Sequence, residues 1–194
     1  MTAEGYESGG RAGQKARTRE LLVRTVRELI AQGRTPTVEE VAETSGVSRT
    51  TTYRYFPNRQ ALVLAAYPET DRSSVVDPEV TDVRARLAAA LDEQLRIVRA
   101  WELQLRASLR VSLDPEAERP VLRGGRAIGW FVDALSPLAE SHDVRALAIA
   151  IRAAVGIEPY VWLTDVAGLS SDEAVATMRR TATTLLEAAL ADGS

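Results

Sequence analysis

Cysteine is absent from the 194-residue sequence, histidine occurs once, and aromatic residues make up only 5%. Without cysteine, neither a disulfide framework nor a cysteine-based zinc site can form. The single histidine, His142, is a poor basis for a metal site or for histidine-dependent catalysis. A glycine-rich phosphate-binding loop is missing as well. We therefore expect no metal ion, no cofactor, no catalytic residues and no enzymatic activity.

Long apolar runs are also missing. No uninterrupted run approaches the ~18 residues needed to span a membrane, and residues 1–14 lack the apolar centre of a signal peptide. The composition, 45% hydrophobic and 26% charged, is typical of a soluble globular protein. We expect a cytoplasmic protein with no membrane partner, in which residues 1–14 form a flexible polar arm.

Charge is distributed unevenly along the chain, although the net charge is only −3. Residues 1–60 hold ten Lys and Arg against seven Asp and Glu, whereas residues 61–194 hold fourteen against twenty. A polyanion such as DNA would therefore be attracted to the N-terminal part and repelled by the rest. This asymmetry predicts contact with nucleic acid at one end only.

Near its N-terminus the sequence has the pattern of a helix-turn-helix. Thr37 and Glu40 have the spacing of a capping box, in which each side chain accepts a hydrogen bond from a backbone N–H group. Gly46 lies where the chain must turn, because glycine reaches positive φ without a Cβ penalty. Ser48 is a suitable N-cap for the second helix, and Pro57 ends that helix.

The outer side of the second helix is polar. Arginine can hold guanine through two hydrogen bonds, and threonine offers a hydroxyl and a methyl group to bases. Tyrosine hydroxyls and basic residues suit phosphate contacts, which set the register without reading the sequence. For any one residue the alternative is a solvated helix face. The predicted DNA contacts are Lys15, Arg17, Thr37, Ser48, Arg49, Thr50, Thr51, Tyr53, Arg54, Tyr55 and Arg59.

This region resembles the DNA-binding region of the TetR family of transcriptional regulators. The resemblance is carried by Ser45-Gly46-Val47-Ser48, Tyr53-Arg54-Tyr55-Phe56, Asn58-Arg59 and Ala61-Leu62, and by the length and pattern of the preceding helix. One departure is Thr52, where the family usually has leucine and where a hydroxyl packs less well. The resemblance implies an all-helical homodimer with an N-terminal DNA-binding domain and a C-terminal domain for effector binding and dimerisation.

The predicted fold is all-α, with a three-helix helix-turn-helix domain over residues 15–67, its motif at about 37–56, and a C-terminal helical bundle over 68–194. No alternating strand pattern is present. The expected helices, about nine in all, cover approximately residues 15–32, 37–44, 48–55, 58–68, 78–112, a short segment from 114 interrupted at Gly124-Gly125, 126–135, 143–166 and 171–191.

The last two predicted helices carry apolar residues at helical spacing that suit contact with another helix. The resemblance implies that these helices form a four-helix interface between two subunits. Packing within one subunit is the alternative, and helix periodicity alone does not exclude it. The predicted dimer contacts are Leu147, Ile151, Ala154, Val175, Met178, Ala182, Leu185 and Ala189.

The predicted C-terminal domain holds every tryptophan of the chain. Pro159 interrupts a helical pattern and predicts a kink, and a kinked helix with aromatic side chains is a suitable wall for an apolar pocket. Glutamates beside aromatic rings would favour a cation. A role in the core is the alternative for each aromatic residue. The predicted ligand contacts are Trp101, Glu102, Leu105, Trp130, Phe131, Glu158, Tyr160 and Trp162.

These observations predict a DNA-binding repressor that a small apolar or aromatic ligand releases from a palindromic operator. The partners would be double-stranded DNA, a second copy of the chain and a small-molecule effector. Two alternatives stay open. One is a dimeric regulator without a ligand, and the other is a helical enzyme or ligand carrier.

Overall fold

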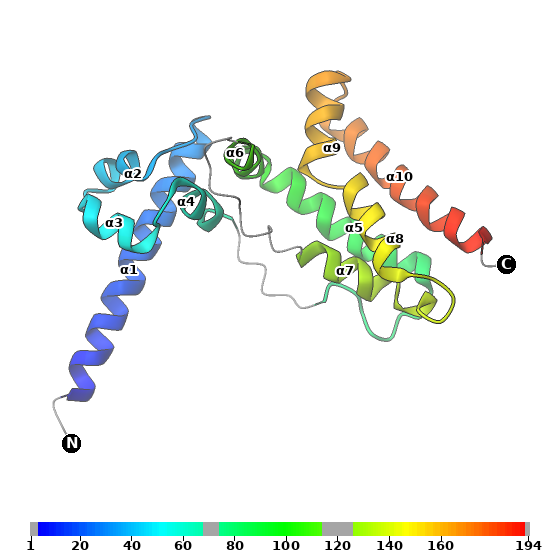
Figure 1. Ribbon diagram of the computed structural model, residues 1–194, viewed down its shortest axis with the longest axis horizontal. Helices are drawn as coiled ribbons and strands as arrows, with labels where there is room; N and C mark the ends of the chain where they lie inside the picture. Colours follow the sequence, from blue (N-terminus) through cyan, green and yellow to red (C-terminus); the bar gives the residue numbers. More distant parts are fainter. Residues whose placement is uncertain (1–3, 68–73, 114–125, 193–194) are drawn as a thin grey trace. The chain divides into compact units, whose positions relative to one another are not determined.

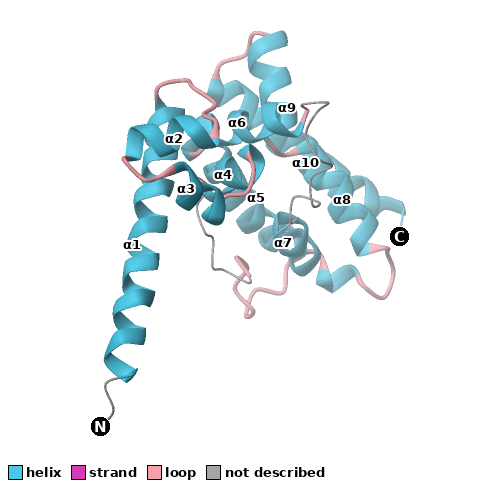
Figure 2. Ribbon diagram, turned by 60° about the vertical axis from the view of Figure 1, so that its left-hand side comes forward, coloured by secondary structure: helices cyan, strands magenta, loops and turns pink. Residues whose placement is uncertain are grey.

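The computed structural model describes residues 4–67, 74–113 and 126–192, and every regular element in these ranges is helical (Figures 1 and 2). The all-α prediction is thereby confirmed. The chain divides into two compact units. The N-terminal unit comprises α1–α4 together with α6 from Leu103 onward, and the C-terminal unit comprises α5 and α7–α10.

The N-terminal unit is built from five helices, α1 (Glu4–Ala31), α2 (Val38–Ser45), α3 (Arg49–Tyr55), α4 (Arg59–Ala65) and α6 (Glu102–Ser112). Its core is a single cluster of apolar side chains. Leu22 and Val26 of α1, Val41 of α2 and Leu62 of α4 are completely buried in it. α6 contributes two further members, Ala107 and Val111, although the sequence-based division placed this segment in the C-terminal domain.

The first helix begins earlier than the sequence predicted. Residues 4–14 belong to α1, whereas we expected a flexible arm over residues 1–14. Each residue added to an existing helix gains one backbone hydrogen bond without a new nucleation cost, which explains why a glycine-containing segment continues the helix. Figure 1 shows the N-terminal half of α1 extending beyond α2–α4.

The C-terminal unit contains α5 (Val83–Ala100), α7 (Arg126–Ala134), a 3-10 turn (Ser136–Leu138), α8 (Val144–Ala154), α9 (Ile157–Val161), a π-helical turn (Trp162–Val166) and α10 (Ser171–Asp192). α8 packs against α7 and α10, and α5 packs against the same two helices. The segments expected at 126–135 and 171–191 are therefore helical. The short helix expected from residue 114 lies outside the described residues.

The helix predicted over residues 78–112 is two helices with a later start. Asp77 and Pro78 form a turn, in which the Asp77 carboxylate accepts a hydrogen bond from the Glu79 N–H at 3.0 Å. α5 begins only after Asp82, whose side chain caps Ala85 N at 2.9 Å. Trp101 then leaves the helical conformation, with φ −123° and ψ 26°. The break lets α5 and α6 bury their apolar faces in different units.

The helix predicted over residues 143–166 is also interrupted. The break lies at Val155 and Gly156, which have extended conformations, and not at Pro159 as the sequence indicated. Pro159 lies in the first turn of α9, where its missing N–H group costs no intrahelical hydrogen bond. The stretch Val144–Val166 is long and apolar enough to cross a membrane by length and composition. It contains Arg145, Arg152, Glu158 and Asp165 and is thus not an uninterrupted apolar run, and the core helix of a soluble protein meets the same test.

Arg86 joins three segments of the C-terminal unit. Its side chain is 7% exposed and donates to the carbonyl oxygens of Val80 at 2.8 Å, Asp133 at 2.8 Å and Ala134 at 3.2 Å. It also pairs with the Asp133 carboxylate at 3.1 Å. Two of the carbonyls belong to the C-terminal end of α7, where a positive charge is favourable. Arg86 thus anchors α7 to α5.

Replacing Arg86 by methionine should lower the free energy of unfolding by about 2–4 kcal/mol, because buried carbonyl groups lose their donors. Urea denaturation followed by tryptophan fluorescence would measure this loss. Arg84→Met is the matched control, since Arg84 lies on the same helix but pairs with Glu187 at an exposed site. An equal effect of the two substitutions would contradict the anchoring role of Arg86.

Candidate DNA-binding site

The helix-turn-helix forms as the sequence predicted. The capping box is present, with Glu40 N donating to Thr37 Oγ1 at 3.2 Å and Thr37 N donating to Glu40 Oε2 at 2.7 Å. Gly46 takes the left-handed conformation at φ 70°. Ser48 caps α3 by accepting a hydrogen bond from Thr51 N at 3.2 Å. The angle between α2 and α3 is thus set by local hydrogen bonds as well as by packing.

The inner side of α3 is held by Thr52 and Phe56, which are 0% and 4% exposed. The Thr52 hydroxyl donates to the Ser48 carbonyl oxygen at 3.1 Å, so the buried oxygen has a partner. The departure from leucine at this position is therefore accommodated without an unpaired polar group. With its inner side buried, α3 presents the rest of its surface outward.

Most of the predicted DNA contacts form one exposed surface. Ser48, Arg49, Thr50 and Arg54 are exposed, and Tyr53 retains 41% of its surface. Thr37 and Thr51 are half-buried beside them. These residues come from α3 and from the N-terminus of α2, two segments that the turn brings together. Lys15 and Arg17 are exposed on α1.

Two predicted phosphate contacts are engaged within the protein. The Tyr55 hydroxyl donates to the Lys15 carbonyl oxygen at 3.2 Å, and the Arg59 guanidinium donates to the Thr35 carbonyl oxygen. Tyr55 has a single hydroxyl proton, so a phosphate contact would require this hydrogen bond to exchange. Arg59 has further N–H groups to offer. The roles of both residues in DNA binding stay predictions.

Sequence reasoning missed Glu39 on α2. Its carboxylate accepts a hydrogen bond from the Tyr53 hydroxyl, and this contact is the main reason why the pKa of Glu39 lies below its ordinary value. The same bond raises the pKa of Tyr53. Arg49 acts electrostatically on both groups. No sequence motif indicates this contact, because fourteen positions separate the two residues.

The predicted ligand contacts have different surroundings in the structure. Trp130, Phe131 and Tyr160 are buried in the C-terminal core, whereas Trp162 is 58% exposed. Leu105 belongs to the N-terminal unit. Glu158 is exposed near Arg152, and Glu102 accepts a hydrogen bond from the Tyr160 hydroxyl. Trp101 is half-buried at the break after α5. A role of these residues in ligand binding stays a prediction.

Two surface grooves of the C-terminal unit lie elsewhere. One, of about 500 Å³, is lined by Asp92, Leu95, Arg96, Arg99, Ala100, Val175 and Arg179. The other, of about 250 Å³, is lined by Ala154, Pro159, Trp162, Leu163, Thr177, Met178 and Thr181. Trp162 is the one predicted ligand contact that borders either groove. The described residues contain no group of three or more acidic, histidine or cysteine side chains suited to a metal ion.

The predicted dimer contacts also need correction. Ile151, Met178 and Ala182 are at most 1% exposed, because α8 and α10 pack on each other within the C-terminal unit. These three side chains pack inside the subunit and leave almost no surface for a second one. The other five are half-buried and stay predictions: Leu147, Ala154, Val175, Leu185 and Ala189.

A capped second helix with an exposed polar side, packed against a first helix that buries Val38, Val41 and Ala42, is the arrangement of a helix-turn-helix DNA-binding domain. Residues 21–66 match the family described as "Bacterial regulatory proteins, tetR family". Searches of curated proteins and of solved structures gave no match. The match covers the helix-turn-helix and the helices on either side of it, and it supports a DNA-binding transcriptional regulator. The sequence-based prediction of this family is confirmed.

The capping box makes the stability of the N-terminal unit depend on pH. The Thr37 backbone N–H group, followed by Arg34, lowers the pKa of Glu40 from its ordinary value of 4.5. A carboxyl whose pKa is lower in the folded state stabilises that state above about pH 4.5, and this contribution is lost as the pH falls through the folded pKa. The unit should therefore melt at lower temperature in acid.

Glu40→Gln should reduce this loss of melting temperature between about pH 6 and about pH 3, because glutamine keeps the capping hydrogen bond without a titrating group. Thermal melts followed by circular dichroism would measure the difference. Glu43→Gln, at an exposed position on the same helix, is the control and should retain the full loss. Identical pH profiles for wild type and Glu40→Gln would contradict the assignment.

Proposed function

We propose that the protein is a cytoplasmic homodimeric repressor that binds a palindromic operator. The observation that carries the proposal is the exposed polar surface of α3, fixed by the buried Thr52 and Phe56 on its inner side. Arg49, Thr50 and Thr51 would read base edges in the major groove. Thr37, Tyr53 and the basic residues of α1 would contact phosphates.

Dimerisation would allow two DNA-binding units to read half-sites about 34–36 Å apart. The C-terminal unit carries an apolar outer face, formed by nine exposed residues of α8, the π-helical turn and α10. Ile149, Trp162 and Val166 are its large members, with 46%, 58% and 70% of their surfaces exposed. The remaining members are Ala146, Ala150, Ala153, Thr181, Thr184 and Ala188.

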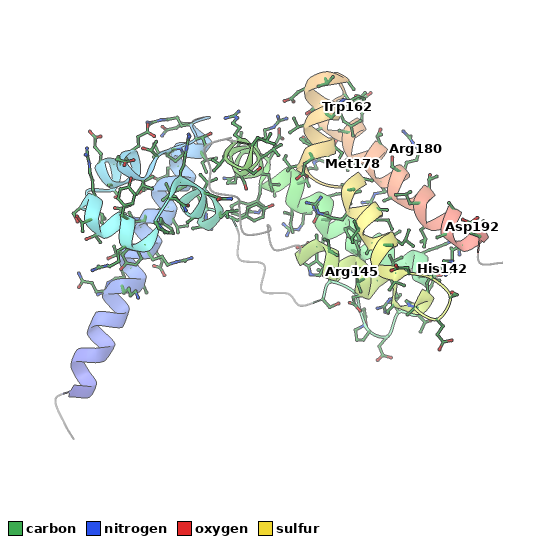
Figure 3. The ribbon with its side chains drawn as sticks, viewed as in Figure 1. His142, Arg145, Trp162, Met178, Arg180 and Asp192 are labelled. Carbon is green, nitrogen blue, oxygen red and sulfur yellow. The ribbon has the colours of Figure 1, made fainter. Side chains whose placement is uncertain are left out.

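This outer face is the candidate dimer interface in place of the buried residues Ile151, Met178 and Ala182, which the sequence suggested. Its α8 members recur at steps of three and four residues, and so they lie on one side of that helix. Trp162 also borders the groove that reaches Thr177 and Thr181 on α10. The π-helical turn and α10 therefore contribute to one continuous surface. Trp162 and Met178, both labelled in Figure 3, line the same groove of the C-terminal unit. A large exposed apolar surface is typical of an interface.

The second part of the proposal is that a small molecule releases the protein from its operator. A ligand can alter DNA affinity only through different affinities for two conformations. The chain passes from the C-terminal unit into α6 of the N-terminal unit at residues 102–103, which provides a covalent route for such coupling. The effector would be an apolar or aromatic molecule that binds the C-terminal unit.

One observation favours a ligand-independent regulator as the second candidate. Trp130, Phe131 and Tyr160 fill the C-terminal core and do not surround a described cavity. One measurement distinguishes the two candidate functions, namely the affinity for the operator in the presence of a panel of aromatic and apolar compounds. A compound that lowers the affinity and changes tryptophan fluorescence at the same concentration supports a repressor with an effector, whereas an unchanged affinity throughout supports the second candidate.

DNA binding can be tested with purified protein and the DNA that flanks its own gene, by fluorescence anisotropy with excess competitor DNA. Tyr53→Phe should weaken binding to the operator, because the hydroxyl that would contact a phosphate is lost. Arg49→Ala should cost about 1–3 kcal/mol and relax the preference at one base pair. Unchanged affinity in both variants would contradict the role of α3.

Trp162→Glu should raise the dimer dissociation constant about tenfold or more, because a tryptophan that becomes buried at an interface is a frequent source of binding energy. Sedimentation velocity over a range of protein concentrations would measure this constant. Leu113→Glu is the control, since Leu113 is 72% exposed but lies at the end of α6 in the N-terminal unit. A dimer that tolerates Trp162→Glu as well as the control would exclude the outer face as the interface.

A further inference from the structure

An acidic side chain lies within the surface that is predicted to meet DNA phosphates. Glu39 occupies the first turn of α2, directly after the cap residue Thr37 and Val38. Its carboxylate accepts a hydrogen bond from the Tyr53 hydroxyl of α3. Thr37 and Arg49 lie near enough to lower the pKa of the same carboxyl group. Three predicted DNA contacts therefore act on Glu39.

This arrangement sets up a competition. A tyrosine hydroxyl has one proton to donate, and a phosphate oxygen accepts hydrogen bonds but cannot donate one at neutral pH. The Tyr53 hydroxyl can therefore donate to Glu39 or to a phosphate, but not fully to both. In addition, the Glu39 charge repels any phosphate that approaches Tyr53 and Arg49. Both effects oppose contacts that do not depend on base sequence.

Part of the carboxylate's position is explained by the helix. An acidic residue in the first turn of a helix is favourable because of the helix dipole, and Glu40 already fulfils this role through the capping box. Glu39 differs from Glu40 because its hydrogen bond crosses from α2 to an exposed side chain of α3. Stability of α2 alone does not require that contact.

We propose that Glu39 holds down the sequence-independent affinity for DNA by competing with phosphates for the Tyr53 hydroxyl. It acts as a positioning residue, since it works through Tyr53 and Arg49. At a specific site, correct base contacts would supply the free energy needed to release the Tyr53 hydroxyl from Glu39. At other sequences these base contacts are missing, and the hydroxyl would stay on Glu39. The inference rests on the proposed DNA-binding function and adds a determinant of specificity to it.

The test uses the full-length protein and a fluorescein-labelled duplex of mixed sequence, with dissociation constants measured by anisotropy at several salt concentrations. Glu39→Ala should bind this duplex about three- to tenfold more tightly than wild type, the range expected from removing one nearby charge and one competing acceptor. Glu39→Gln, which keeps an acceptor for Tyr53 but not the charge, should lie between the two. Circular dichroism would confirm that the variants are folded.

Two comparisons separate this role from a general effect of charge. Glu43→Ala removes the same charge from an exposed position on the same helix and should change the affinity much less. In a Tyr53→Phe background, Glu39→Ala should give a clearly smaller gain, because no hydroxyl is released. A gain that is equal at both glutamates, or independent of Tyr53, overturns the proposal.

The remaining outcomes also decide the question. If wild type and Glu39→Ala bind the mixed duplex equally, the inference fails while the proposed function stands. If wild type does not bind and Glu39→Ala does, both are supported. If every variant fails to bind at the lowest salt concentration, the proposed function and the inference are both overturned.

Discussion

The burial of one side of α3 is the constraint on which the DNA-binding surface depends. An isolated helix of seven residues is not stable in water, because nucleation costs more than so few hydrogen bonds return. Here the Ser48 cap and the burial of Thr52 and Phe56 hold the helix in place. Its outer side is thereby free to carry polar residues that contribute little to folding, and the N-terminal unit can present them without losing its core.

The same separation of roles appears in the C-terminal unit. α8 and α10 bury Ile151, Met178 and Ala182 between them, which holds the bundle together, while Ile149, Trp162 and Val166 remain exposed. One apolar segment therefore supplies a core on one side and a candidate interface on the other. Its interruption at Val155 and Gly156 and its π-helical turn set the direction in which Trp162 points.

The polar residues of the N-terminal unit fall into two groups with different roles. Hydrogen bonds inside the unit engage Tyr55 and Arg59, which are thereby tied to the frame of the domain. Arg49 and Arg54 stay exposed on α3, and Glu39 lies close enough to Arg49 to moderate its field. Affinity for a polyanion is thus balanced against selectivity within a few side chains, where an excess of basic residues would favour binding to any sequence.

Local sequence determined the elements whose cause is local. The capping box at Thr37, the turn at Gly46 and the polar outer side of α3 are properties of adjacent residues, so spacing alone predicted them. Tertiary structure decided the rest. Periodicity shows that one side of a helix is apolar but not which neighbour covers it, and so the division at Trp101, the burial of Met178 and the exposure of Trp162 were not predicted. The contact between Glu39 and Tyr53 joins two helices, and only the packing of those helices brings the two side chains together.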